Sequence, residues 1–333
     1  MMKSIALVFA LTVAMHCGGC AQQAALQQAS ADSQAAQAKG DYKTAALDLN
    51  PIVAAYPENP QAYMAQAYDY FEAGEADQEI ADVSRAIELE PNAAEYRISR
   101  SQAYTRIPRF DLALEDANEA IRIAPNTAYC YSSRGYVYMA MGDSAKAIAD
   151  LSHAIELDPN NAMFQVQRGF AYGMAGRYAE TQADWQAAIK MRPDYGAAYS
   201  ALGWLQATCP DARFRDAKQA LENAKRGAGL GPSTILVAAA SSGAVKSETK
   251  PKPGSNSPAV AWSLDALAAA YAESGDFQQA VAVQQQAISH NKMSPNPLAT
   301  KEQQLLALYQ QQKPYRAGFD AVVPSLPWIV LPS

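Results

Sequence analysis

The chain has 333 residues, with 27 lysines and arginines against 33 aspartates and glutamates, and a formal net charge of −6. Nucleic-acid binding depends on neutralising phosphates with basic side chains, so this acidic balance argues against a nucleic-acid partner. Alanine, glutamine and tyrosine are abundant while β-branched residues are sparse, which favours helices over sheets.

Residues 1–20 have the pattern of an export signal. Lys3 supplies a positive start, an apolar run covers residues 5–15, and small residues follow it. A membrane-spanning helix needs about 20 apolar residues, and this run is shorter. We therefore expect an exported protein, located in the periplasm or anchored in the cell envelope.

The residues around Cys20 leave two ways of processing this signal open. Gly18 and Gly19 precede Cys20, and the segment resembles the lipobox of bacterial lipoproteins, although Cys17 stands where the lipobox has leucine. The resemblance implies that Cys20 carries a lipid and tethers the protein to a membrane. The alternative is plain cleavage after Ala21, which gives an untethered exported protein.

Five prolines recur at intervals of 34 residues along the chain. They are Pro57, Pro91, Pro125, Pro159 and Pro193. Because proline cannot continue a helix, each one marks the end of a helical unit. The period is of the length that is typical of helical repeat proteins.

Each 34-residue unit contains two helical stripes, as the unit that begins at Ala128 illustrates. One set of residues recurs at i, i+4 and i+7 on a first helix, and a second set repeats this spacing on a second helix. The two sets are Tyr131, Gly135 and Tyr138, then Ala147, Leu151 and Ala154. Gly142-Asp143 between them predicts a helix stop followed by an N-terminal cap.

This pattern of large, small and aromatic residues closed by proline resembles the tetratricopeptide repeat (TPR). The resemblance implies an all-α fold, a right-handed α-α superhelix (solenoid) of helix-turn-helix repeats. We place about six repeats in residues 26–227, and the first is degenerate because Pro51 interrupts its second helix.

Three further segments follow this array. Residues 228–257 are rich in Gly, Ser, Pro and Lys and predict a flexible linker or long loop. Residues 258–312 predict a C-terminal TPR-like repeat plus a capping helix that covers the end of the stack. Residues 313–333 form an apolar, Pro-rich tail.

TPR resemblance also implies that the first helix of each unit lines a concave groove. The groove residues should lie on the stripe next to the packing stripe. That stripe contains Tyr68, Phe71, Tyr129, Tyr136, Met139, Met163, Phe170 and Trp204. Such aromatic residues could hold an apolar helix or an extended peptide of a protein partner, or they could simply pack against the next unit.

Charged residues recur with the same period. Arg100, Arg134 and Arg168 are each followed 16 residues later by an acid, namely Asp116, Asp150 and Asp184. The arginine lies on the first predicted helix and the aspartate on the second, so we predict that they pair within each helix hairpin. A charged ladder that faces a partner is the alternative.

No pattern in the sequence indicates catalysis. His153 and His290 lie on different units, no Gly-rich phosphate loop is present, and Cys130 and Cys209 are 79 residues apart. We predict no enzyme activity, cofactor or metal, and we interpret the two cysteines as buried thiols, with a disulfide as the alternative.

The sequence therefore predicts a non-enzymatic scaffold that binds a protein or peptide in the bacterial cell envelope through its concave groove. Two alternatives stay open: an envelope-assembly component that binds through the edges of the solenoid, and an enzyme or small-ligand binder.

Overall fold

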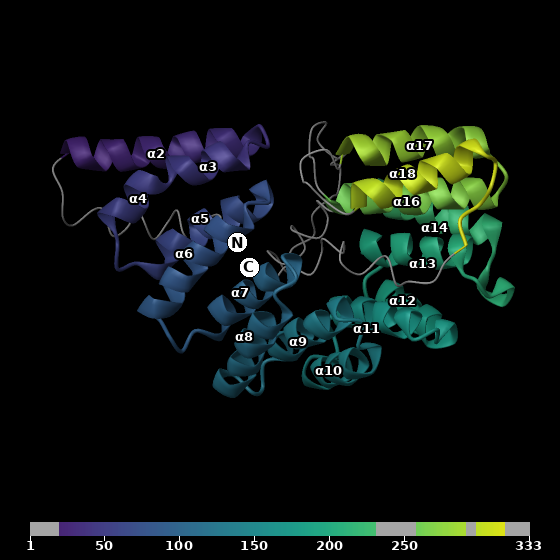
Figure 1. Cartoon of the computed structure of the whole chain (residues 1–333), viewed down its shortest axis with the longest axis horizontal. Coiled ribbons are helices and arrows are strands. Elements are labelled where there is room, and N and C mark those ends of the chain that lie inside the picture. The colour runs from purple at the N-terminus through teal and green to yellow at the C-terminus, as the bar shows by residue number, and fades with distance from the viewer. Residues whose placement is uncertain (1–19, 231–257, 291–297, 317–333) are drawn as a thin grey trace. The chain divides into compact units, whose positions relative to one another are not determined.

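The computed structural model describes residues 20–230, 258–290 and 298–316 of the chain (Figure 1). Within these ranges the secondary structure is helical and contains no strand, so the predicted all-α fold class is confirmed. The predicted signal before residue 20, most of the predicted linker and the tail beyond residue 316 lie outside the described residues.

The helices follow one another with short connections. In chain order they are α2 (Cys20–Ala38), α3 (Tyr42–Asp48), α4 (Asn50–Ala55), α5 (Pro60–Ala73), α6 (Ala76–Leu89), α7 (Ala94–Arg106), α8 (Phe110–Ile123), α9 (Ala128–Ala140), α10 (Ser144–Leu157), α11 (Ala162–Met174), α12 (Tyr178–Met191), α13 (Gly196–Thr208), α14 (Ala217–Leu230), α16 (Pro258–Glu273), α17 (Phe277–His290) and α18 (Leu298–Gln310).

The turns between paired helices form where the sequence predicts them. Gly142 has a φ of 80°, a left-handed conformation that suits glycine. The side chain of Asp143 then accepts a hydrogen bond from the backbone N–H of Lys146 and caps α10. Near the start of the described chain, α3 ends at Asp48 and α4 begins at Asn50, with Pro51 in its first turn.

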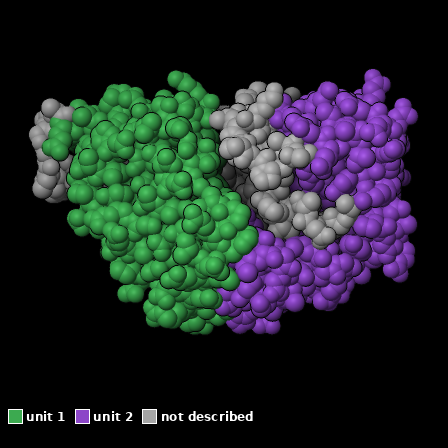
Figure 2. Space-filling model, viewed as in Figure 1, with its two compact units in different colours: residues 1–133, 333 green, residues 134–332 purple. Residues whose placement is uncertain are grey.

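The chain divides into two compact units (Figure 2). The boundary between them lies within α9. Unit 1 extends to Ser133 and unit 2 begins at Arg134. In unit 1, α5 packs against α6 and α7 against α8, while α6 also contacts α7. In unit 2, α11 pairs with α12, α13 with α14 and α16 with α17, and each pair contacts the next. Stacked helix hairpins are thus the building blocks of both units.

Two boundaries differ in detail from the sequence prediction. The last helix of the predicted array, α14, continues to Leu230, so residues 228–230 are helical, although the sequence places them in the linker. A short 3₁₀ helix, Ala212–Phe214, fills the longer loop between α13 and α14. At the end of the described chain, α18 packs against α17, in the place expected for a capping helix.

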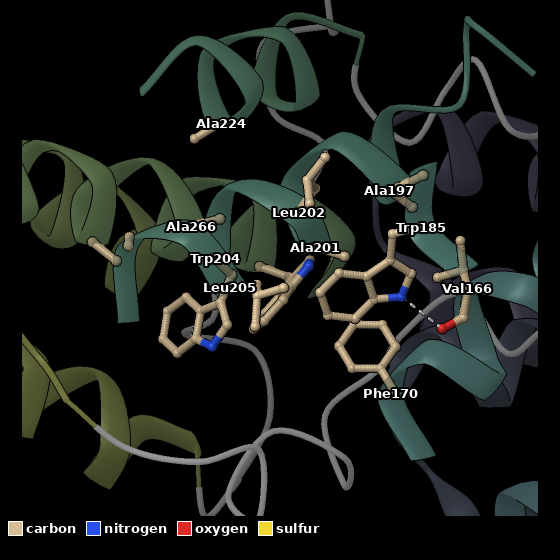
Figure 3. Close-up of a cluster of buried hydrophobic side chains, with 14 of the residues drawn as sticks. Val166, Phe170, Trp185, Ala197, Ala201, Leu202, Trp204, Leu205, Ala224 and Ala266 are labelled. Atoms are coloured by element: carbon tan, nitrogen blue, oxygen red, sulfur yellow. Dashed lines mark hydrogen bonds between the residues drawn. The ribbon is translucent and has the colours of Figure 1, made fainter. Parts of the chain in front are cut away.

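The core of unit 2 depends on close approach between helices. A Cβ atom added to Gly169 of α11 would lie 2.3 Å from Nε1 of Trp185 on α12. The glycine therefore makes room for the indole, which is fully buried and donates a hydrogen bond of 3.0 Å to the carbonyl of Val166 (Figure 3). The small residue on the first helix and the large one on the second are complementary in shape.

Candidate functional site

All eight residues of the predicted binding stripe lie on first helices of the repeats. Helix α5 carries Tyr68 and Phe71, α9 carries Tyr129, Tyr136 and Met139, α11 carries Met163 and Phe170, and α13 carries Trp204. The two units divide this stripe, and they bury its residues to different extents.

In unit 1 the stripe forms a small aromatic face, which we call the unit 1 face and define as Tyr68, Phe71 and Arg106. The rings of Tyr68 and Phe71 lie 6.5 Å apart, and the guanidinium of Arg106 from α7 lies 4.5 Å from the Phe71 ring. The Tyr68 hydroxyl donates to the Glu72 carboxylate at 2.7 Å, and Arg106 forms an ion pair with Glu79. Burial and the nearby Glu72 raise the pKa of Tyr68, so its hydroxyl stays protonated and able to donate.

The side chains of the unit 1 face are half-buried, and Tyr129 and Met163 are half-buried too. An aromatic ring that keeps part of its surface in water, beside a guanidinium, can bind an apolar side chain and a polar group together. Their binding role nevertheless stays a prediction.

In unit 2 the stripe residues other than Met163 lie inside the protein. Tyr136 and Met139 are 5% and 1% exposed, and Phe170 and Trp204 are fully buried. For these four side chains the structure favours the alternative that the sequence left open, packing within the array. A partner could reach them only if the residues that cover them moved.

The buried stripe residues are part of an aromatic cluster, which we call the unit 2 cluster and define as Phe170, Trp185, Trp204, Trp262 and Tyr315. Phe170 packs against Trp185, with the ring centroids 4.9 Å apart (Figure 3). The Phe170 ring also lies 6.1 Å from the Trp262 ring. Trp204 lies 5.1 Å from Trp262 and 5.8 Å from Tyr315. Two of the covering residues, Trp262 and Tyr315, come from the C-terminal part of the chain.

The segment after α18 returns to α13. Arg316 donates to the backbone carbonyl of Ala207 at 3.1 Å and pairs with Glu273, which also pairs with Arg215 at 3.5 Å. Sequence reasoning missed this contact, because these residues belong to a tail without helical periodicity.

A buried polar cluster attaches α18 to α16 and α17, and sequence reasoning missed it as well. Gln284 donates to Asp265 at 2.7 Å, and Glu302 lies beside them, nearly fully buried. Burial and the nearby Glu302 raise the pKa of Asp265 to about 7, while burial lowers the pKa of Lys301. A charged residue on a helix is usually exposed, so no local signal marks this cluster.

The predicted arginine–aspartate pairs are confirmed. Arg100, Arg134 and Arg168 each donate from Nε and Nη2 to both carboxylate oxygens of the aspartate 16 residues later, at 2.7 to 2.8 Å. The aspartates are buried and the arginines half-buried. These pairs hold each hairpin together, so the alternative of a ladder facing a partner is not needed to explain them.

Asp82 occupies the aspartate position of an earlier repeat but lacks an arginine partner of this kind. The residue 16 positions before it is Gln66, which donates to Ala46 and Asn50 at 2.8 Å. Oδ2 of Asp82 is buried without a hydrogen-bond partner, and burial raises the pKa of Asp82 to about 7. This repeat therefore has the aspartate of the pair, but glutamine replaces the arginine.

The described residues offer little for other chemistry. They contain no group of three histidine, cysteine or acidic residues that could hold a metal. Cys130 and Cys209 are free and buried, as interpreted from the sequence, and burial raises the pKa of both thiols, that of Cys130 to about 11. None of the helices within 20–230, 258–290 and 298–316 has the length and apolar content to cross a membrane.

Comparison with known proteins supports the repeat assignment. Residues 128–161 match one tetratricopeptide repeat family model, and residues 31–89 and 65–128 match another. No curated protein matches the sequence.

Two solved structures share the fold. A tetratricopeptide repeat protein from Parabacteroides merdae ATCC 43184 is 16% identical, with a TM-score of 0.52, over 86% of this chain and 99% of that one. A chain of the APC/C hetero-tetramer Cut9–Hcn1 is 14% identical, with a TM-score of 0.57, over 83% of this chain and 48% of that one. The family matches over residues 31–161 and this shared fold together support the tetratricopeptide repeat as the unit from which the chain is built.

Proposed function

We propose that this protein is a non-enzymatic scaffold of the bacterial cell envelope that binds a protein or peptide through the first-helix stripe of its repeats. Tetratricopeptide repeat proteins generally bind protein or peptide partners, and stacked repeats provide extended surfaces for this purpose. Of the two units, unit 1 offers the better candidate surface for contact with this partner, namely the unit 1 face.

The observation that carries this proposal is the half-buried state of Tyr68 and Phe71 beside Arg106. Aromatic rings and arginine are the side chains most enriched at protein-binding hot spots. Because these side chains already lie in fixed positions, with the hydroxyl of Tyr68 and the guanidinium of Arg106 held by carboxylates, little conformational entropy is lost when a partner binds.

Affinity capture from the native cell envelope tests the proposal. We expect the double variant Tyr68→Ala with Phe71→Ala to lose captured partners at least tenfold, since two hot-spot truncations cost about 2 kcal/mol or more. Leu112→Ala is the matched control, because Leu112 is an exposed apolar residue, 38% exposed, on the second helix α8 of the same unit. Thermal unfolding of both variants separates lost binding from lost folding.

A second candidate function is supported by exposed apolar residues away from the stripe. Leu47 and Met141 are 49% and 45% exposed, and Leu112 belongs with them. They favour an envelope-assembly component that makes contacts through the edges of the array. In that case Leu112→Ala would reduce capture and the double variant at Tyr68 and Phe71 would leave it unchanged, which reverses the first expectation.

Export and a lipid at Cys20 belong to the same proposal. The apolar run before Cys20 and the preceding glycines support them. Mass measurement of the mature N-terminus is the test. A lipidated Cys20 supports the tether, whereas an unmodified chain beginning after Ala21 excludes it.

A further inference from the structure

The negative charge of the chain is concentrated in unit 1. Residues 20–133, the described part of this unit, contain 17 aspartates and glutamates against 8 lysines and arginines, a formal net charge of −9. Residues 134–333 contain 16 acidic and 18 basic residues, a formal net charge of +2. Because a charged surface attracts ligands of the opposite charge, unit 1 favours a basic partner and unit 2 does not.

One of these acids, Glu72, lies directly beside the unit 1 face. It is half-buried on α5 and accepts a hydrogen bond of 2.7 Å from the hydroxyl of Tyr68. Within the part of the chain that the structure describes, no lysine or arginine forms an ion pair with Glu72. A carboxylate can accept about four hydrogen bonds, so Glu72 can accept further donors from outside the chain.

The basic residue of the face is already neutralised by an acid of the same unit. Arg106 forms an ion pair with Glu79, which is buried on α6. Its guanidinium also lies 4.5 Å from the Phe71 ring. Since the charges of Arg106 and Glu79 cancel, the face and its immediate surroundings keep the negative charge of Glu72. This arrangement favours a cationic ligand over an anionic one.

Glu72 is not part of the pattern that holds the hairpins together. Residues with that role recur at intervals of 34, as the arginine–aspartate pairs do. No acid recurs at the position of Glu72 in the following repeats, where the residues are Arg106, Ala140, Met174 and Thr208. The carboxylate is therefore specific to the hairpin that carries the aromatic rings, which is expected of a residue that recognises a ligand.

We propose that the unit 1 face binds a basic segment of a partner protein, in which a lysine or arginine pairs with Glu72 and a neighbouring apolar side chain packs on Tyr68 and Phe71. The ring centroids are 6.5 Å apart, so one apolar side chain can contact both rings. The aliphatic stem of the basic residue can lie along Tyr68 while its charged end reaches Glu72. This inference rests on the proposed function, because it names the class of partner for the same face.

Selection from a random peptide library on the immobilised full chain tests the partner class. We expect the selected peptides to contain a lysine or arginine next to a large apolar residue. A parallel selection on Tyr68→Ala with Phe71→Ala identifies peptides that bind elsewhere, and these are set aside. Fluorescence anisotropy of labelled synthetic copies then measures the affinity of each remaining peptide.

A charge-removing variant tests the role of Glu72. Glu72→Gln removes the charge but keeps an oxygen that accepts from the Tyr68 hydroxyl, and it should weaken binding of the selected peptides about fivefold. Glu115→Gln is the matched control, because it removes the same charge from an exposed position on α8 of the same unit. The control should change the affinity less than twofold. Glu72→Lys should select acidic peptides in place of basic ones.

The salt dependence of binding to the unaltered chain is an independent measurement, which needs no variant to fold. Affinity for the selected peptides should fall severalfold between about 0.03 and 0.3 M salt, because salt screens exposed charges. An affinity that does not change with salt would overturn the proposal.

The outcomes separate this inference from the proposed function. Selected peptides that depend on Tyr68 and Phe71, yet lack basic residues and bind Glu72→Gln as tightly as the unaltered chain, would overturn the basic partner class alone. A selection that gives no peptide dependent on the two rings would overturn the basic partner class and the proposed binding role of the unit 1 face together.

Discussion

Both units are built from the same kind of helix hairpin, but the equivalent position of the stripe is half-buried in unit 1 and fully buried in unit 2. Tyr68 and Phe170 are 102 residues apart, which is three repeats of 34, and Trp204 follows one repeat later. Tyr68 is half-buried in unit 1, where the hydrophobic clusters are small, whereas Phe170 and Trp204 are fully buried in unit 2 within one cluster that extends from Tyr136 to Tyr309.

This contrast shows that the position within a repeat does not determine exposure. The helices and segments that follow the array determine it, because Trp262 and Tyr315 cover the stripe only in unit 2. We therefore expect the stability of unit 2 to be more sensitive than that of unit 1 to substitutions that change core packing.

The largest effect is expected from removing the central indole of unit 2. Trp185→Ala should lower the free energy of unfolding of that unit by about 3–5 kcal/mol, because it leaves a cavity beside Phe170 and Gly169. Chemical denaturation followed by hydrogen exchange measures the loss and assigns it to a unit. A loss below about 1 kcal/mol, or one confined to unit 1, would contradict the contrast between the units.

Overpacking the same contact should cost less. Gly169→Ala places a Cβ against the Trp185 indole and should destabilise unit 2 by about 1–3 kcal/mol. Gly229→Ala in α14 is the matched control, because an added Cβ meets nothing within 4 Å there. The control should be neutral or slightly stabilising, since alanine favours a helix over glycine. Thermal unfolding of both variants gives the comparison.

A double-mutant cycle on Arg134 and Asp150 should give a coupling energy of about 1–2 kcal/mol, since the pair is bidentate and shielded from solvent. The parallel cycle on Glu119 and Arg122, an exposed pair on α8, should show no measurable coupling. If the Arg134–Asp150 cycle also showed no measurable coupling energy, the arginine–aspartate pairs would not hold the hairpins together.

The smallest effect concerns Asp82 in unit 1. Its pKa is raised to about 7 by burial, so the folded state binds a proton more tightly than the unfolded state. Stability from this group is therefore full below about pH 4 and is lost as the pH rises towards 7. Because the Asp82 side chain is partly exposed, solvent screening limits this pH-dependent change in the free energy of unfolding to about 1 kcal/mol.

Asp82→Asn should remove this part of the pH dependence, which denaturant unfolding of the full chain between about pH 4 and 8 would measure through a probe in unit 1. Ala81→Asn, at the exposed neighbouring position, is the control and should keep the pH dependence. A pH profile that is unchanged in Asp82→Asn would show that the carboxyl titrates normally.

Much of the fold could be predicted from the sequence, because its signals are local and repeated. The prolines, the Gly142-Asp143 turn and the 16-residue spacing of arginine and aspartate each act within one hairpin. The burial of Phe170 and Trp204 could not be predicted, since the residues that cover Trp204 lie 58 to 111 positions later and follow no repeat register. The Asp265 cluster was missed because its burial depends on how α18 docks.

The arginine pairs also have a consequence for how the array unfolds. Nη1 of Arg100 donates to Ser84 of the preceding hairpin at 2.9 Å, and Arg168 reaches Ser152 in the same way at 3.3 Å. Arg100 and Arg168 thus each connect two consecutive hairpins, so that opening one hairpin weakens its neighbour and raises the cooperativity of unfolding. Gln66 stands at the arginine position of its repeat and cannot form an ion pair with Asp82. We therefore expect unfolding of the array to begin among the helices that precede α7.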